Sequence, residues 1–224
     1  MVDYVEAIKK PFSDMMTLGL GIVIGFVPIV SLLVSGYSVG VARNTIKGDN
    51  KLPAWDLAKV VDYIKDLVFA LIIGVIYMIP GGILILIGAA AAIGSIFGAI
   101  ASGDMASLPG GLVAGLASGG IFLILGGILL VVGWILSSMG IMFYAKEGNL
   151  GSAFKISAIL KKVLTVTYLV TLIVMVIYVF VLSLIAAILL IIPVIGGFIG
   201  SGLVTFLAGV TGYTMLAQVF KETP

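Results

Sequence analysis

The chain has 224 residues, of which 62% are hydrophobic and only 10% are charged, and its net charge is +2. Soluble domains carry about 25% charged residues, so this composition excludes a water-soluble fold. The basic residues are dispersed along the chain, which gives no indication of nucleic acid as a partner. There is no Cys and no His, so disulfides, thiol chemistry and the usual zinc and haem ligands are excluded.

Four long apolar runs contain no Asp, Glu, Lys or Arg: 15–42, 67–103, 105–145 and 163–220. A helix of about 20 apolar residues crosses a bilayer core of roughly 30 Å, and every run is longer than that. Backbone in lipid must satisfy its own hydrogen bonds, and long uninterrupted runs do so as helices rather than as barrel strands. The sequence therefore predicts an all-α, polytopic helical membrane protein of the cell (plasma) membrane, with residues 1–224 in a single integral membrane domain.

The N-terminal segment 1–11 is expected to be an interfacial amphipathic stretch. It mixes charged residues with apolar ones and holds no apolar core of a cleavable signal peptide. The first apolar run then contains Pro28, which breaks or kinks a helix. Residues 15–42 are consequently either one kinked span or a hairpin that turns at Pro28.

The distribution of basic residues favours the hairpin. Segments 43–66 and 145–162 are amphipathic and basic, so we expect both to be cytoplasmic, whereas loop 102–111 carries only Asp104 and is expected outside. A hairpin at Pro28 places all 12 basic residues and both termini on the cytoplasmic side.

This arrangement predicts about six membrane segments, at approximately 12–27, 29–46, 64–101, 112–144, 163–192 and 198–220. Pro193, followed by Gly196 and Gly197, is expected to break the last run into two spans. Segment 64–101 would be about 57 Å of straight helix, so a break is expected at Pro80, Gly81 and Gly82, giving either a kink or a helix that emerges beyond the bilayer. The helices are also rich in glycine, 30 of 224 residues, which implies close helix approach.

The most specific text lies in the cytoplasmic segment. Its elements, in order, are Lys9 to Phe12, Gly36-Tyr37, Arg43, Lys47-Gly48 and a Leu52-Pro53-Ala54-Trp55-Asp56 box. This order resembles an integral-membrane family found mainly in archaea and some bacteria, catalogued as domain of unknown function 4013. The sequence departs from the family pattern at Ala54, where an acidic residue is common, and at Lys65-Asp66, where a Gly is usual. The resemblance implies a fold, with a Pro-broken first run and a long following span, but no activity.

The box has a structural and a functional interpretation. In the structural one, Pro53 starts a helix, Trp55 anchors it at headgroup depth and Asp56 complements the helix dipole. In the functional one, Arg43, Lys47, Trp55 and Asp56 form a docking site for a lipid headgroup or a partner. The acidic residues that follow are spaced as a solvated helix face, so we expect neither a metal site nor a bound cofactor.

The sequence offers no nucleophile–base pair and no His, so an enzyme is not expected. We expect a non-enzymatic structural or accessory membrane protein that binds lipid or partner subunits, with a homo-oligomer or another membrane protein as possible partners. The alternative is a transporter or channel for a small neutral or apolar solute, with gates at Pro80 and Gly126. A proton relay is not expected, because the apolar runs carry no titratable Asp, Glu, Lys, Arg or His.

Overall fold

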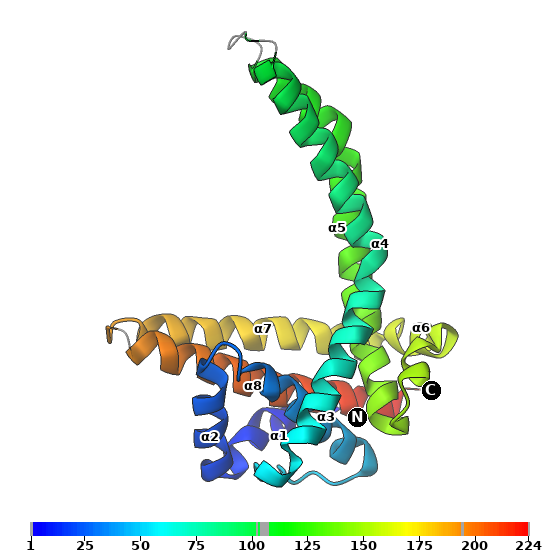
Figure 1. The fold of residues 1–224 in the computed structure, drawn as a ribbon. Coiled ribbons are helices and arrows are strands. Elements are labelled where there is room, and N and C mark those ends of the chain that lie inside the picture. The colour runs from blue at the N-terminus through cyan, green and yellow to red at the C-terminus, as the bar shows by residue number, and fades with distance from the viewer. Residues whose placement is uncertain (1, 102, 104–107, 194, 224) are drawn as a thin grey trace. The chain divides into compact units, whose positions relative to one another are not determined.

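The computed structural model describes residues 2–101, 103, 108–193 and 195–223, and this part of the chain is all-helical (Figure 1). The α-helices are α1 (Tyr4–Lys9), α2 (Met15–Phe26), α3 (Leu32–Lys47), α4 (Val60–Ala101), α5 (Leu108–Glu147), α6 (Ile156–Val163), α7 (Val166–Leu189) and α8 (Ile195–Glu222). Short 3-10 helices η1 (Lys10–Ser13), η2 (Leu57–Lys59) and η4 (Leu150–Phe154) lie between them. The chain divides into a first unit, Met1–Ile73 with Ser138–Pro224, and a second unit, Gly74–Ser137.

Four of the described helices are long and apolar enough to cross a membrane, at Leu57–Ala101, Pro109–Glu147, Val166–Leu189 and Ile195–Glu222. These helices indicate a membrane-embedded protein, as the charge-free runs predict. The other two predicted segments form α2 and α3, which have 12 and 16 residues. At 1.5 Å per residue these helices are about 18 and 24 Å long, shorter than the hydrocarbon core. The count of six membrane segments therefore stays a prediction.

In the first unit, α8 is the central helix, and α2, α3 and α7 pack against it. Buried side chains from α3 and α8, including Tyr37, Phe206 and Val210, form the main hydrophobic cluster. Phe26 at the end of α2 contacts Phe198 near the start of α8, with ring centroids 5.7 Å apart. The turn that holds Pro28 therefore lies beside the α7–α8 turn.

Polar contacts hold the N-terminal segment near the opposite end of α8. The Asp3 amide donates to Gln218 near the end of α8, and Lys10 Nζ donates to Thr45 Oγ1 at the end of α3. The predicted interfacial segment is thus seen as α1 and η1 held against α3 and α8, with Ala7 and Lys10 buried. Whether this segment also contacts lipid stays a prediction.

In the second unit, α4 and α5 pack with their backbones in direct contact. A methyl group built on Gly81 would lie 2.7 Å from the Leu130 amide nitrogen, and one built on Gly126 would lie 2.9 Å from Gly81 O. A methyl group on Gly119 would overlap Gly88 O in the same way. The contact glycines lie seven residues apart on each helix, the spacing that keeps one face of a helix against its partner.

The outward faces of the second unit are apolar all round. Leu86, Phe97 and Leu116 are 71%, 65% and 67% exposed, and most of the large apolar side chains between them are exposed as well. A helix pair of this kind is stable only where its surroundings are also apolar, which is the situation in a bilayer.

Pro80 does not end a helix, and the kink expected there stays a prediction. Pro80 lies inside the uninterrupted helix α4, and α5 likewise runs through Gly126. Proline is tolerated within membrane helices because local adjustments and neighbouring groups satisfy the freed carbonyl. Gly81 serves the close contact with α5 instead of ending α4, and the side of Gly82 faces open space.

Pro193 lies between α7 and α8, whereas Gly196 and Gly197 lie in the first turn of α8 rather than in the connection. A methyl group on Gly196 would overlap Leu189 O, so this glycine permits the tight return of the chain. Within the predicted external loop 102–111, residues 102 and 104–107 lie outside the described residues, which resume at Leu108.

Candidate functional site

The candidate site is built where α3 crosses the start of α4. Gly36 permits the crossing, because a methyl group there would overlap Tyr63 O and approach the Leu67 amide nitrogen to 3.1 Å. With the two backbones this close, Tyr37, Gly40 and Asn44 on α3 and the first turns of α4 line one common space. Gly48 then ends α3 in the left-handed conformation, with φ 91°, and the chain turns back toward α4.

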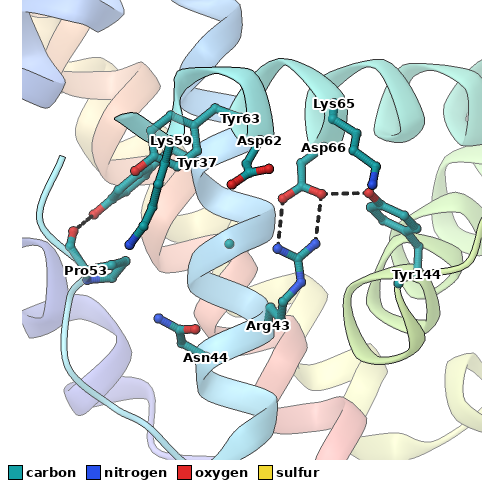
Figure 2. A pocket seen from close by; sticks show the side chains of 12 residues that line it. Tyr37, Arg43, Asn44, Pro53, Lys59, Asp62, Tyr63, Lys65, Asp66 and Tyr144 are labelled. Atoms are coloured by element: carbon teal, nitrogen blue, oxygen red, sulfur yellow. Dashed lines mark hydrogen bonds and ion pairs between the residues drawn. The ribbon is translucent and has the colours of Figure 1, made fainter. Parts of the chain in front are cut away.

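An ion pair ties this crossing to the end of α5. Arg43 Nη1 donates to Asp66 Oδ2 at 3.0 Å, and Arg43 Nη2 donates to Asp66 Oδ1 at 2.8 Å (Figure 2). Tyr144 Oη donates to Asp66 Oδ1 at 2.7 Å, and Arg43 Nε donates to Ala145 O at 3.3 Å. One carboxylate therefore accepts hydrogen bonds from both α3 and α5.

We call the Arg43, Asp66 and Tyr144 network the clamp, because its hydrogen bonds join α3, α4 and α5. Asp66 is buried, with 4% of its surface exposed, and its two oxygens accept three hydrogen bonds. Burial alone would lower the pKa of the Arg43 guanidinium, but the hydrogen bonds and negative charge of Asp66 raise that pKa above its ordinary value. Arg43 stays charged, and Asp66 is held as an acceptor rather than presented as a free base.

A cavity of about 390 Å³ opens beside the clamp. Figure 2 shows the side chains of Asn44, Lys59 and Asp62 surrounding the same space as Arg43. No heavy atom lies within 4 Å of where a Cβ on Gly40 would be, so this side of α3 leaves room for the cavity. The space is lined by both cationic and anionic groups, which suits a polar or zwitterionic group rather than an apolar one.

The Leu52 to Asp56 box covers the aromatic side of the crossing. Tyr37 Oη donates to Pro53 O, and the Trp55 ring stacks on the Tyr37 ring with centroids 4.2 Å apart. Trp55 also meets the Tyr63 ring edge-on at 5.4 Å. Asp56 caps η2 by accepting from the Ala58 amide at 2.9 Å, so the box acts mainly as packing and capping.

The four residues predicted as a docking site do not form one group. Arg43 lines the cavity, whereas Trp55 packs on the aromatic rings and Asp56 caps η2. Lys47 is exposed at the end of α3 and is not among the described residues that line the cavity. Asp66 as the partner of Arg43, and Tyr144 as a second donor to Asp66, were not predicted from the sequence. Asp66 lies 23 residues from Arg43, and Tyr144 lies 78 residues from Asp66.

A second polar contact lies near the N-terminus. Lys10 is 4% exposed, and its Nζ donates to Thr45 Oγ1 at 2.7 Å. Burial lowers the pKa of Lys10 to about 8, although the charges of Glu6 and Asp49 act in the opposite direction. Within the described part of the chain, no three His, Cys, Asp or Glu side chains gather as metal ligands.

Comparison with known proteins identifies the family. A family model described as a protein of unknown function, DUF4013, matches residues 19–191. The chain belongs to this family. The DUF4013 match includes Arg43, Asp66 and Tyr144, so the whole clamp lies within the matched region. The family's description names no activity, and neither the curated proteins nor the solved structures gave a match to the chain.

Proposed function

We propose that this DUF4013 protein is a non-enzymatic accessory component of the cell membrane, which binds lipid or a partner subunit at a cytoplasmic polar face. The observation that carries this proposal is the cavity of about 390 Å³ beside Arg43 and Asp66. The Arg43–Asp66–Tyr144 contacts join α3, α4 and α5 beside the cavity, and Lys59, Asp62 and Asn44 lie at its wall as groups that a polar ligand would meet. These are the features of a recognition site.

The charge pattern supports a cytoplasmic position for this face. The cavity is lined by residues from 37–66 and by Tyr144 and Gly148, which belong to the two basic segments or border them. Basic segments next to membrane helices remain in the cytoplasm. Both termini would lie on the same side, since α1 and the end of α8 are joined by the Asp3–Gln218 hydrogen bond.

The close packing of α4 and α5 weighs against the alternative of a transporter or channel. The gates expected at Pro80 and Gly126 lie where the backbones of the two helices touch: a methyl group on Gly126 would be 2.9 Å from Gly81 O. Such a contact leaves no path for a solute between these two helices. The cavity beside Arg43 and Asp66 lies instead among charged residues of the first unit.

The proposal is tested by purifying the full chain in mild detergent and identifying the lipids and proteins that remain bound. The variant Lys59→Gln/Asp62→Asn changes the cavity wall without changing the net charge or the clamp, and it should lose one bound lipid species or one partner. The matched control Lys9→Gln/Asp3→Asn changes two charges at exposed positions of the N-terminal segment. Identical bound species in the wild type and the cavity variant would contradict the proposal.

A solute-flux measurement separates the alternative. Liposomes that contain the purified protein should show no uptake of small neutral solutes beyond that of empty liposomes. Saturable uptake would favour the transporter and would require a pathway that does not run between α4 and α5.

A further inference from the structure

A second cavity lies at the end of α5, beside α6, and its lining is strongly basic. The cavity measures about 650 Å³, and the side chains that line it include Lys146, Lys155, Lys161 and Lys162. No Asp or Glu is among the described residues that line it. Four ammonium groups around one space repel one another, so an anion placed among them would be bound favourably.

Lys162 is the buried lysine of this cavity, and it connects α6 to the end of α8. It is 7% exposed, and its Nζ donates to Phe220 O at 2.9 Å and to Thr223 O at 2.7 Å, the free carbonyls at the end of α8. The ammonium groups of Lys162 and Lys146 lie 4.4 and 5.6 Å from the centroid of the Phe220 ring. Burial, and then the charge of Lys146, lower the pKa of Lys162.

The remaining lysines are available at the surface. Lys146 and Lys161 are exposed, and Lys155 pairs with Glu147 at 2.7 Å while half of its side chain stays exposed. A pair of this kind is weak in water and can rearrange around a stronger anion. Ser157 also lines the cavity and supplies a hydroxyl.

Helix α6 presents an apolar stripe next to these lysines. Ile156, Leu160 and Leu164, spaced four residues apart, are 44%, 39% and 76% exposed. Its other side is buried, with Ile159 and Val163 packed inside the first unit. A helix with one face in the protein, an exposed apolar stripe and flanking lysines is typical of the membrane interface.

The connection from α6 to α7 indicates how deep the apolar stripe lies in the membrane. Helix α7, an apolar helix of spanning length, begins at Val166, directly after α6. Val166 is 75% exposed, so the apolar surface continues from Leu164 into the spanning helix. The lysines of α6 therefore lie where the hydrocarbon core ends, at the level of the lipid phosphates.

We propose that α6 and the end of α5 bind the phosphate group of an anionic membrane lipid. Lys146, Lys155 and Lys161 contact the phosphate, and the Ile156–Leu160–Leu164 stripe lies among the acyl chains. The proposal rests on the membrane position given under the proposed function, but it concerns a surface separate from the Arg43–Asp66 cavity.

The test uses the full chain in mild detergent, titrated with dioctanoyl phosphatidylglycerol and observed by native mass spectrometry. The site variant is Lys146→Gln/Lys161→Gln, and the matched control Lys9→Gln/Lys51→Gln removes the same charge at exposed positions elsewhere. Each lysine near an anionic lipid contributes about 1 kcal/mol, so the site variant should bind the lipid roughly 30-fold more weakly. The control should bind it as the wild type does.

Two further ligands identify the source of the phosphate group. Dioctanoyl phosphatidylcholine and inorganic phosphate should each bind far more weakly than the anionic lipid, because one lacks net charge and the other lacks acyl chains. Equal binding of inorganic phosphate would make this a free-phosphate site and overturn the proposal, as would equal lipid affinity in the site and control variants. If the double variant does not fold, Lys161→Gln alone should weaken binding about five-fold.

The outcome can be distinguished from failure of the proposed function. The cavity variant Lys59→Gln/Asp62→Asn should keep its affinity for the anionic lipid at α6. Loss of that affinity in the cavity variant would place the lipid at the Arg43–Asp66 cavity and would contradict a separate site.

Discussion

The clamp at Asp66 allows a quantitative prediction. Asp66→Asn removes the negative charge that faces Arg43 and leaves one acceptor oxygen where three donors now converge. A hydrogen bond to a charged group contributes about 1.5–3 kcal/mol, and breaking a buried ion pair costs about 3–5 kcal/mol. The Arg43 side chain is 30% exposed, so water recovers part of the loss.

We therefore expect Asp66→Asn to destabilise the protein by about 3 kcal/mol. For a chain of this size 1 kcal/mol corresponds to about 2–4 °C, so the apparent Tm should fall by roughly 6–12 °C. Thermal unfolding of the purified protein in detergent, followed by tryptophan fluorescence, measures this shift. Trp55 packs against Tyr63 at the same crossing and reports the change locally.

Asp62→Asn is the matched control, because it makes the same chemical change one turn earlier on α4 at an exposed position. Its effect should stay within about 0.5 kcal/mol. The double variant Arg43→Gln/Asp66→Asn should lose less stability than the sum of the two single variants, since both act on one ion pair. Equal melting temperatures for Asp66→Asn and Asp62→Asn would refute the assignment of Asp66 as the clamp.

Three further changes test other parts of the structure by the same unfolding assay. Gly119→Leu should lower the apparent Tm strongly because its side chain would overlap the α4 backbone, whereas Gly120→Leu, which faces open space, should not. Equal effects would contradict the close glycine contact between α4 and α5. Trp55→Ala should lower the free energy of unfolding by about 1–3 kcal/mol through lost apolar contact, more than Trp134→Ala on the exposed face of α5. A Trp55→Ala variant that stays stable but loses a ligand would make Trp55 a binding residue. The pKa of Lys10 is about 8 in the folded protein and 10.5 in the unfolded chain, so between these pH values only the unfolded chain keeps the proton. The free energy of unfolding should therefore rise with pH across this window, and Lys10→Gln should abolish that rise.

The membrane helices could be predicted from the sequence because the signal is local. Charge-free runs longer than the hydrocarbon core leave helices as the only simple solution, and the positions of Pro28 and Pro193 fall in the connections between helices. Pro80 carries the same local signal but lies inside α4, because the contact with α5 on both sides of it keeps the helix continuous. Tertiary packing decided that case.

The close glycine contact between α4 and α5 has a sequence signal of a different kind. Gly81 and Gly88 in α4, and Gly119 and Gly126 in α5, recur at intervals of seven residues. This interval differs from the four-residue spacing of a GxxxG pair, the more familiar mark of close helix contact. An antiparallel pair of helices held by a seven-residue repeat of small residues could have been predicted from that interval.

The clamp had no such signal. Asp66 sits among Asp62 and Lys65 in the first turns of a long helix, where charged residues are usually a solvated face. Tyr144 is one tyrosine at the end of another apolar helix. Only the close crossing at Gly36 makes Asp66 buried and brings it to Arg43 and Tyr144, and a contact between distant segments leaves no mark in local spacing.

The most direct test of the central claim is site-specific photo-crosslinking from the cavity in intact cells. A benzophenone amino acid replaces Asn44 at the cavity wall, and the same residue replaces Lys47, exposed three residues further along α3, as the control. The account predicts one discrete lipid or protein adduct from position 44 that is absent from position 47. The adduct should also disappear when Lys59→Gln/Asp62→Asn is introduced. No adduct at position 44, or the same adducts from both positions, would contradict a binding role for the cavity beside Arg43 and Asp66.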